Sequence, residues 1–397
     1  MAEVPIMSRP APVGVLEDVP VDAPNDAPAD LPADVPADVP VARWGVWAGV
    51  AVATFLTVRE SFQWINVIHP DVTIGRNAAH LLLGPGELHL YAQYPVAQMG
   101  PGAILLSLLP RPLYLLLIAG LLGPVLLRLV DAALAVSGRA LTPAVALMAT
   151  VGAVGCAWPW SQLAWKGHAD DALVLAGAAM MLPSRHPGRR RLRIRLIGVA
   201  VAALGKPTAV VLLGLTVGWE GAAALAAVAV FALVWLPFVV VDPAGFLHAG
   251  RGVMAVGPQS LPNLLGYQAG SAPPSWIRFV QLGGGALVVA LAVVRQRPLH
   301  ALLAAFVVRA VVDPNPAPAY CIGVVVLAVA VDLSRRQPLP WTTMPAVVAF
   351  WASPAVLAGG PGGFRAAVLL GLLAILLIEV VSHRIPRPAR RAALSTA

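Results

Sequence analysis

The sequence RESFQWINVIHPDVTIGRNAAHLLLGPGELHLYAQYPVAQMGPGAILLSLLPR, residues 59–111, is the longest polar interruption in an otherwise apolar chain. It carries His69, Asp71, Arg76 and Tyr94 within a few helical turns of one another. Ionisable groups are costly near a lipid bilayer, so a group of them between apolar segments indicates a site. We expect the segments on either side to form the scaffold that holds this stretch.

The composition indicates a polytopic membrane protein. Of the 397 residues, 58% are hydrophobic and 12% are charged, whereas soluble domains carry roughly 25% charged residues. A spanning helix needs about 20 mainly apolar residues, so we expect an all-α transmembrane bundle of about twelve spans. Residues 59–111 form its long first outer loop, with short interfacial helices. The expected spans lie near residues 44–58, 112–134, 142–160 and 172–183, on both sides of residues 205–207, and near 221–241, 276–294, 299–312, 319–333, 341–358 and 365–381.

Both ends of the chain differ in composition from the apolar domain at 43–382. In residues 1–42 the pattern Asp-x-Pro-x occurs six times between Asp18 and Pro40. Proline at every fourth position forbids a helix, and this composition cannot bury a core. We therefore expect a disordered acidic tail at 1–42 and a basic tail at 383–397, both in the cytoplasm.

The arginines predict the orientation in the membrane. Cytoplasmic loops are enriched in Lys and Arg, and residues 184–195 hold six arginines. With this loop in the cytoplasm, Arg139, Arg335 and both termini lie inside. Loop 59–111, His168, Lys206, a second loop at 242–275 and residues 313–320 then lie on the outer face of the cell membrane. This count requires that 95–109 is not a span. Positive charge in short loops is a topology signal, so no nucleic-acid partner is expected.

Asp71 allows two interpretations. It precedes a helix-like segment at 73–83, where a carboxylate can act as a general base on a hydroxyl group. The same position suits a helix N-cap. His69, His80 and His89 are spaced by eleven and nine residues, which matches no compact metal motif. Neither a cofactor nor a metal is expected.

Other ionisable residues follow at the ends of later spans. Lys206 lies between two apolar half-helices, where its ammonium either extends to the interface or faces a phosphate. Arg309 lies in the last turn of a span and needs an anion, either Asp313 or a ligand phosphate. His168, Asp170 and Asp171 open the fourth span, where acidic residues also suit a helix N-terminus.

The order of these motifs resembles the GT-C membrane glycosyltransferases, most closely the actinobacterial polyprenyl-phosphate-mannose-dependent mannosyltransferases of glycosyltransferase family 87. The likeness rests on short motifs and covers most of residues 44–335. The matching pieces are Asp71 to Gly84 with Tyr91 and Tyr94-Pro95, then Gly167-His168-Ala169-Asp170-Asp171, Gly205-Lys206-Pro207, and Arg309 with Asp313-Pro314 and Tyr320. The chain departs from the family pattern in its single proline after Tyr94 and in His168, where glutamine is common.

The resemblance implies transfer of a sugar, which is mannose in the family pattern, from a polyprenyl-phosphate donor to a lipid or glycan acceptor on the outer face. Asp71 would be the general base. Lys206 and Arg309 would bind the donor phosphate, and a single displacement would invert the anomeric carbon. His69, Arg76, Tyr94, His168, Asp170, Asp171 and Asp313 would bind or support the substrate. Two other functions remain open: a transporter or flippase of a lipid-linked sugar, and a GT-C-like scaffold without activity.

Overall fold

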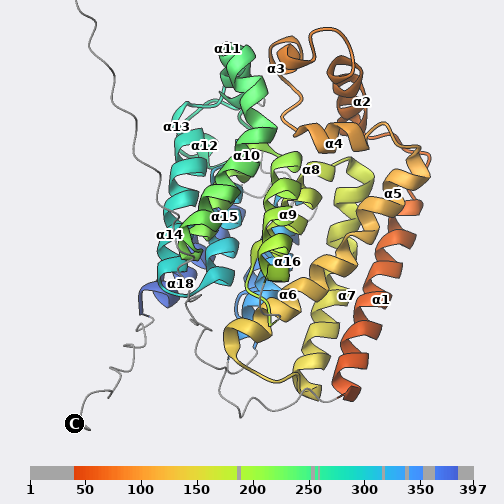
Figure 1. Ribbon diagram of the computed structural model, residues 1–397, viewed down its shortest axis with the longest axis vertical. Coiled ribbons are helices and arrows are strands. Elements are labelled where there is room, and N and C mark those ends of the chain that lie inside the picture. The colour runs from red at the N-terminus through yellow and green to blue at the C-terminus, as the bar shows by residue number, and fades with distance from the viewer. Residues whose placement is uncertain are drawn as a thin grey trace, which may run out of the picture. The chain divides into compact units, whose positions relative to one another are not determined.

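The computed structural model describes residues 40–185, 189–251, 255–257, 260–314, 318–335, 339–351 and 363–382, and every regular element in them is helical (Figure 1). The expected tails at 1–39 and 383–397 lie outside these residues. The first helix, α1, covers Pro40–Phe62. Three residues assigned from the sequence to the acidic tail therefore belong to α1, because the last proline of the repeat occupies its first position, where a missing N–H costs nothing.

Within the described residues, six helices are long and apolar enough to cross a membrane. They support an all-α membrane protein, whereas twelve spans remain a prediction. They are α1, the run of α5 (Arg111–Gly120) and α6 (Leu122–Ser137), α7 (Pro143–Lys166), α10 (Gly221–Val241), the run of α13 (Trp276–Phe279), η3 (Val280–Gly284) and α14 (Gly285–Val294), and α18 (Gly363–Ser382).

Three shorter helices lie among them: α8 (Ala169–Met181), α15 (Pro298–Val312) and α16 (Ile322–Ser334). Nearly every residue of α15 and α16 is buried, and the two helices pack on each other. A helix that is hydrophobic on all sides belongs in a protein interior. Because these helices are surrounded by protein, their apolar length does not have to match a bilayer.

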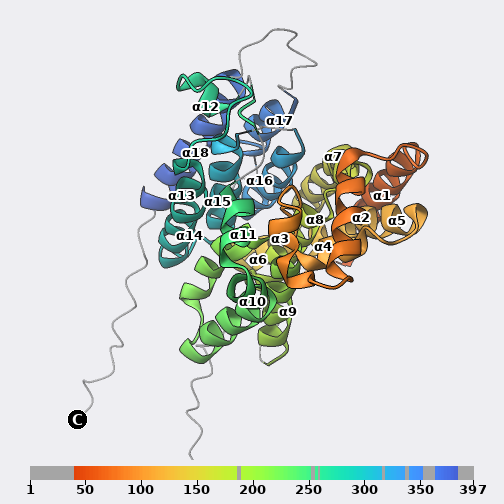
Figure 2. The ribbon, with the colours of Figure 1, turned by 90° about the horizontal axis from the view of Figure 1, so that it is seen from above.

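Loop 59–111 folds into short helices, as expected. They are α2 (Pro70–Leu82), the 3₁₀ turn η1 (Glu87–His89), α3 (Leu90–Gln93) and α4 (Pro101–Leu106). The six residues of α4 are far too few to cross a membrane, so residues 95–109 contain no span. In the view from above, these helices lie over the region of α7 and α8, and α2 contacts α7 while α4 contacts α8 (Figure 2).

The expected break at Gly205-Lys206-Pro207 is present. The helix α9 (Arg189–Gly205) ends there, Lys206 is extended, and the 3₁₀ helix η2 (Pro207–Gly218) follows. The Gly100 N–H donates to the Gly205 carbonyl at 2.6 Å. A Cβ on Gly100 would lie 2.4 Å from the Leu204 carbonyl oxygen. The backbone of loop 59–111 is thus held against the broken helix, which brings Lys206 towards that loop.

The remaining described helices are α11 (Pro243–Arg251), α12 (Leu261–Leu264), η4 (Pro318–Cys321) and α17 (Thr343–Trp351). Both α11 and α12 belong to the second loop, at 242–275. Here α11 packs on α3, and His89 Nδ1 lies 3.1 Å from Asp242 Oδ2. The two expected outer loops therefore meet at one end of the bundle, near α2, α3 and α11 in Figure 1.

Two of the arginines expected in the cytoplasm contact each other. Arg139 donates to the Arg335 carbonyl at 2.5 Å, and Arg335 pairs with Glu379 at 2.7 Å. Arg185 pairs with Asp131 at 3.2 Å. The contact between Arg139 and Arg335 agrees with the expected grouping of their two loops. Which group faces the cytoplasm remains a prediction.

Candidate functional site

A buried cluster of charges lies where α8, η2 and α15 converge. Lys206 Nζ lies 2.5 Å from Asp170 Oδ2 and 3.1 Å from Asp171 Oδ1. Arg309 Nη1 donates to the same Asp171 Oδ1 at 2.6 Å. Both aspartate side chains are at most 5% exposed. Two cations from distant segments therefore converge on a single carboxylate oxygen.

This geometry corrects two interpretations from the sequence. Lys206 is buried and ion-paired, so it does not extend to a membrane interface. The anion bound by Arg309 is Asp171, which neither sequence alternative named. Asp170 and Asp171 lie in the first turn of α8, as expected, and their side chains also bind these cations.

Tyr320 covers the two cations. The Lys206 ammonium lies 5.7 Å and the Arg309 guanidinium 5.0 Å from the centre of its ring. A cation over an aromatic face is attracted by the negative charge of that face, most strongly away from water. The ring of His168 also meets Tyr320 edge-on at 6.0 Å. Tyr320 thus packs against three of the predicted site residues.

Asp71 is the second residue of α2, and the N-cap of that helix is His69. The His69 side chain accepts a hydrogen bond from the Asp71 N–H at 3.4 Å. The N-cap interpretation of Asp71 is therefore wrong for this structure. Its carboxylate Oδ2 instead lies 3.5 Å from His69 Nδ1 and 3.4 Å from His168 Nε2, and the side chain is 28% exposed. This carboxylate is accessible and flanked by two imidazoles.

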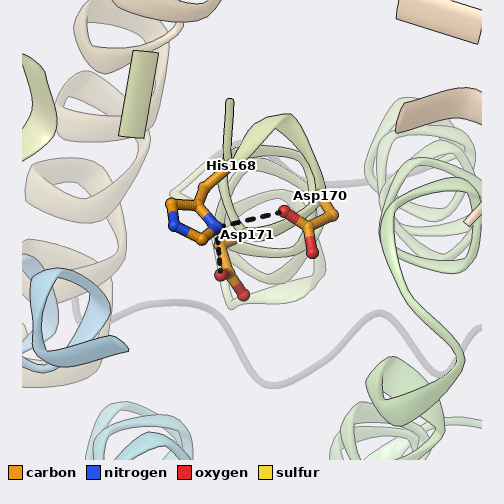
Figure 3. Close-up of side chains that lie close together, drawn as sticks. All are labelled: His168, Asp170 and Asp171. Carbon is orange, nitrogen blue, oxygen red and sulfur yellow. Dashed lines mark ion pairs between the residues drawn. The ribbon is translucent and has the colours of Figure 1, made fainter. Parts of the chain in front are cut away.

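His168 connects Asp71 to the charge cluster. Its Nε2 faces Asp71, and its Nδ1 lies 4.0 Å from Asp170 Oδ1 and 4.0 Å from Asp171 Oδ2, as the dashed lines in Figure 3 mark. Contacts thus run from Asp71 through His168 to Asp171 and Arg309. The Gly167-His168 turn permits this arrangement, because Gly167 has φ +94° and a Cβ there would lie 2.7 Å from Val72. Only glycine lets α7 end this close to α2.

Burial lowers the pKa of His69 below its usual range, and the neighbouring Asp71 carboxylate opposes that shift. At neutral pH His69 is therefore uncharged. Because its Nδ1 accepts from the Asp71 N–H, its proton is on Nε2.

His168, Asp170 and Asp171 offer three ligand atoms within 4.8 Å of one another. This spacing alone does not indicate a metal, because Lys206 and Arg309 already balance the two carboxylates. The three histidines of loop 59–111 do not gather either. His69 faces Asp71, His89 faces Asp242, and His80 is exposed in the last turn of α2.

Three further residues predicted to bind or support the substrate have other surroundings in the structure. Arg76 donates from Nε to the Ser107 carbonyl at 3.2 Å and so joins α2 to α4. Tyr94 ends α3 and packs on the hydrophobic core. Asp313 is buried at the end of α15, where its charge acts on Arg309.

The structure adds polar residues that the sequence analysis did not select. Arg278 donates to Gln281 Oε1 at 2.6 Å and to Gln98 Oε1 at 3.1 Å, which links α13 to loop 59–111. Gln281 is buried, and its Nε2 donates no hydrogen bond within the described residues. Gln281 was detectable, because it is a polar residue inside the apolar run 276–294.

A small apolar cavity adjoins Arg309. Its volume is about 40 Å³, and its wall comes from α8, η2, η3 and α15. Most of the lining is aliphatic or aromatic, such as Val174, Leu212 and Phe306, with Thr208, Gln281 and Arg309 as the polar members. A cavity of this volume has room for only a few water molecules, and the Arg309 guanidinium is among its lining groups.

Comparison with known protein families, with curated proteins and with solved structures finds no match for this chain.

Proposed function

We propose that this chain is a membrane glycosyltransferase that moves a sugar, in the first instance mannose, from a polyprenyl phosphate to a lipid or glycan acceptor. The observation that carries the proposal is the continuous set of contacts from Asp71 through His168 and Asp171 to Arg309. It puts a candidate base at one end and paired cations beside an apolar cavity at the other. A donor with a lipid chain, a phosphate and a sugar presents these chemical groups in the same order.

The reaction follows from this arrangement. The acceptor hydroxyl attacks the anomeric carbon, its oxygen–carbon bond forms, and its proton passes to the Asp71 carboxylate. The bond between that carbon and the phosphate oxygen breaks. The growing charge on the prenyl phosphate is then stabilised by Lys206 and Arg309, two cations already held in place.

The mechanism inverts the configuration of the sugar. A retaining reaction needs a second carboxylate as nucleophile, about 5–5.5 Å from the first. Asp170 and Asp171 are held by Lys206 and Arg309, with His168 between them and Asp71. One displacement with one base fits these roles.

The test uses the full chain reconstituted in lipid vesicles, with a prenyl phosphate mannose donor and a mixed glycolipid pool as acceptor. The product is measured by mass spectrometry. Asp71→Asn keeps the shape of the side chain but removes the base, and general-base catalysis contributes roughly 100- to 10,000-fold. We therefore expect transfer at least about a hundredfold slower, with unchanged donor binding.

The matched control is Glu87→Gln, an equivalent change at an exposed carboxylate of the same loop. It should leave transfer unchanged. A parent-like rate in Asp71→Asn together with loss in Glu87→Gln would move the base to Glu87. Movement of intact donor across the vesicle membrane without any product would instead identify a flippase.

A further inference from the structure

Two buried carboxylate oxygens in the cluster lack a hydrogen-bond donor within the described part of the chain. They are Asp170 Oδ1 and Asp171 Oδ2. The two residues are only 3% and 4% exposed. The other oxygen of each aspartate binds Lys206 or Arg309. Leaving a buried acceptor without a donor costs about 1–3 kcal/mol. These two atoms therefore select a ligand that donates hydrogen bonds.

The two oxygens face the same side chain. Each lies 4.0 Å from His168 Nδ1, so the three atoms surround one position (Figure 3). The His168 Nε2 faces the Asp71 carboxylate, and with the ring proton on Nε2 the Nδ1 atom is an acceptor. The two carboxylate oxygens at this position are acceptors.

Charge decides what kind of donor fits. Lys206 and Arg309 already pair with Asp170 and Asp171, so a divalent cation at this position would be repelled by two buried positive charges. A hydroxyl group donates a hydrogen bond without adding charge. Neutral hydroxyl groups are therefore a better match than a metal ion.

On the other side of the ion pairs, the free hydrogen-bonding group is a donor and not an acceptor. Gln281 Oε1 is occupied by Arg278, which can only donate, so the free group is the Nε2 donor. This donor lines the cavity beside Arg309. Donors thus lie on the cavity side of the cluster and acceptors on the Asp71 side. One ligand matches both sides if it carries anionic oxygens next to a group rich in hydroxyls.

We propose that Asp170 Oδ1, Asp171 Oδ2 and His168 Nδ1 form a subsite for the hydroxyl groups of the transferred sugar, an inference that rests on the proposed function. The subsite makes these residues determinants of specificity. A site built to accept hydrogen bonds from a hydroxyl strongly rejects the analogue without it, because its buried acceptors are then left unpaired.

The experiment measures binding of two probes to the full chain in lipid nanodiscs. One is a short prenyl phosphate, and the other is the same prenyl phosphate carrying mannose. For the parent chain, we expect the sugar to strengthen binding at least about tenfold. In Asp170→Asn the amide oxygen still faces Lys206, while an NH₂ donor replaces the free acceptor. Because the Asn removes a negative charge beside Lys206, binding of bare prenyl phosphate should be retained or strengthened, whereas the gain from the sugar should disappear.

Asp131→Asn is the matched control, because Asp131 is an ion-paired aspartate at the opposite end of the bundle. It should retain the gain from the sugar. A second measurement needs no variant: on the parent chain, at least one of the monodeoxy mannose analogues should bind about tenfold more weakly. This keeps the test decisive if Asp170→Asn does not fold.

Two results would overturn the subsite while leaving the proposed function standing. One is binding of bare prenyl phosphate with no gain from the sugar, or with no penalty from any deoxy analogue. The other is a gain that EDTA abolishes and Mn²⁺ restores, which would assign the three atoms to a cation. Absence of prenyl phosphate binding altogether would count against both the subsite and the proposed donor.

Discussion

His69 begins α2 and also faces the Asp71 carboxylate, so its protonation affects both helix stability and the site. Its pKa is lowered in the folded chain, mainly by burial. As pH falls through the ordinary histidine range, this group therefore binds protons more readily in the unfolded chain than in the folded chain. Stability from this group is therefore fully present above its unfolded pKa of about 6.5 and is lost as pH falls towards the folded pKa. A protonated imidazole also cannot accept from the Asp71 N–H.

Two substitutions separate these effects. His69→Asn keeps an N-cap but does not titrate, whereas His69→Ala removes the cap, which costs about 1 kcal/mol. We expect the thermal midpoint of the parent in detergent to fall between pH 7.5 and 5.5 more steeply than that of His69→Asn. At pH 7.5 only His69→Ala should be destabilised. Parallel pH curves for the parent and His69→Asn would show that His69 does not titrate in this range.

At the scale of elements, the contact between loop 59–111 and the broken helix aligns the site. The Gly100 N–H binds the Gly205 carbonyl one residue before Lys206. In Gly100→Ala the new methyl group would meet backbone atoms of Leu204 and Gly205, which cannot rotate away. We expect a loss of about 1–3 kcal/mol in stability and weaker prenyl phosphate binding, measured by thermal unfolding and by the nanodisc assay.

The control for this change is Gly155→Ala in α7, where an added Cβ meets nothing within 4 Å. Alanine is the better helix former, so stability should stay equal or rise by up to about 1 kcal/mol. Equal stability of the two variants would mean that the contact between Gly100 and Gly205 does not hold the loop in place.

Long apolar helices that are largely exposed on the protein surface are the ones that sequence predicts well. The expected spans 221–241 and 276–294 coincide with α10 and with the α13–α14 run, because a long apolar run bounded by polar residues is a strong local signal. The shorter α8, α15 and α16 are equally apolar but lie inside the protein. Hydrophobicity alone does not distinguish a protein interior from lipid, so their lengths and the number of spans could not be fixed.

For the site, the sequence predicts which residues need a partner but not which partner each one has. Asp71, His168, Lys206 and Arg309 stand out as ionisable residues in apolar surroundings, and the structure does bring them together. Their pairing could not be predicted. Asp171 and Arg309 are 138 positions apart, and the contact depends on how α8 packs near α15. Sequence identifies residues that need a partner, whereas the fold decides which partner they meet.

For the whole molecule, the separation of charges predicts one orientation in the membrane. Loops 59–111 and 242–275 contact each other through His89 and Asp242, and Arg139 contacts the Arg335 carbonyl. Because cytoplasmic loops are enriched in arginine, the loop with Asp71 should face outward. A lipid-linked donor suits that face, because its lipid chain keeps it in the membrane.

Cysteine labelling with a membrane-impermeant maleimide tests this orientation. The two native cysteines, Cys156 and Cys321, are buried and give little background. Glu87 is exposed in loop 59–111, and Leu339, four positions after Arg335, is 46% exposed. In intact cells Glu87→Cys should be labelled and Leu339→Cys should not, until the membrane is permeabilised. The reverse pattern would put the Asp71 carboxylate in the cytoplasm and remove the basis for a donor presented on the outer leaflet.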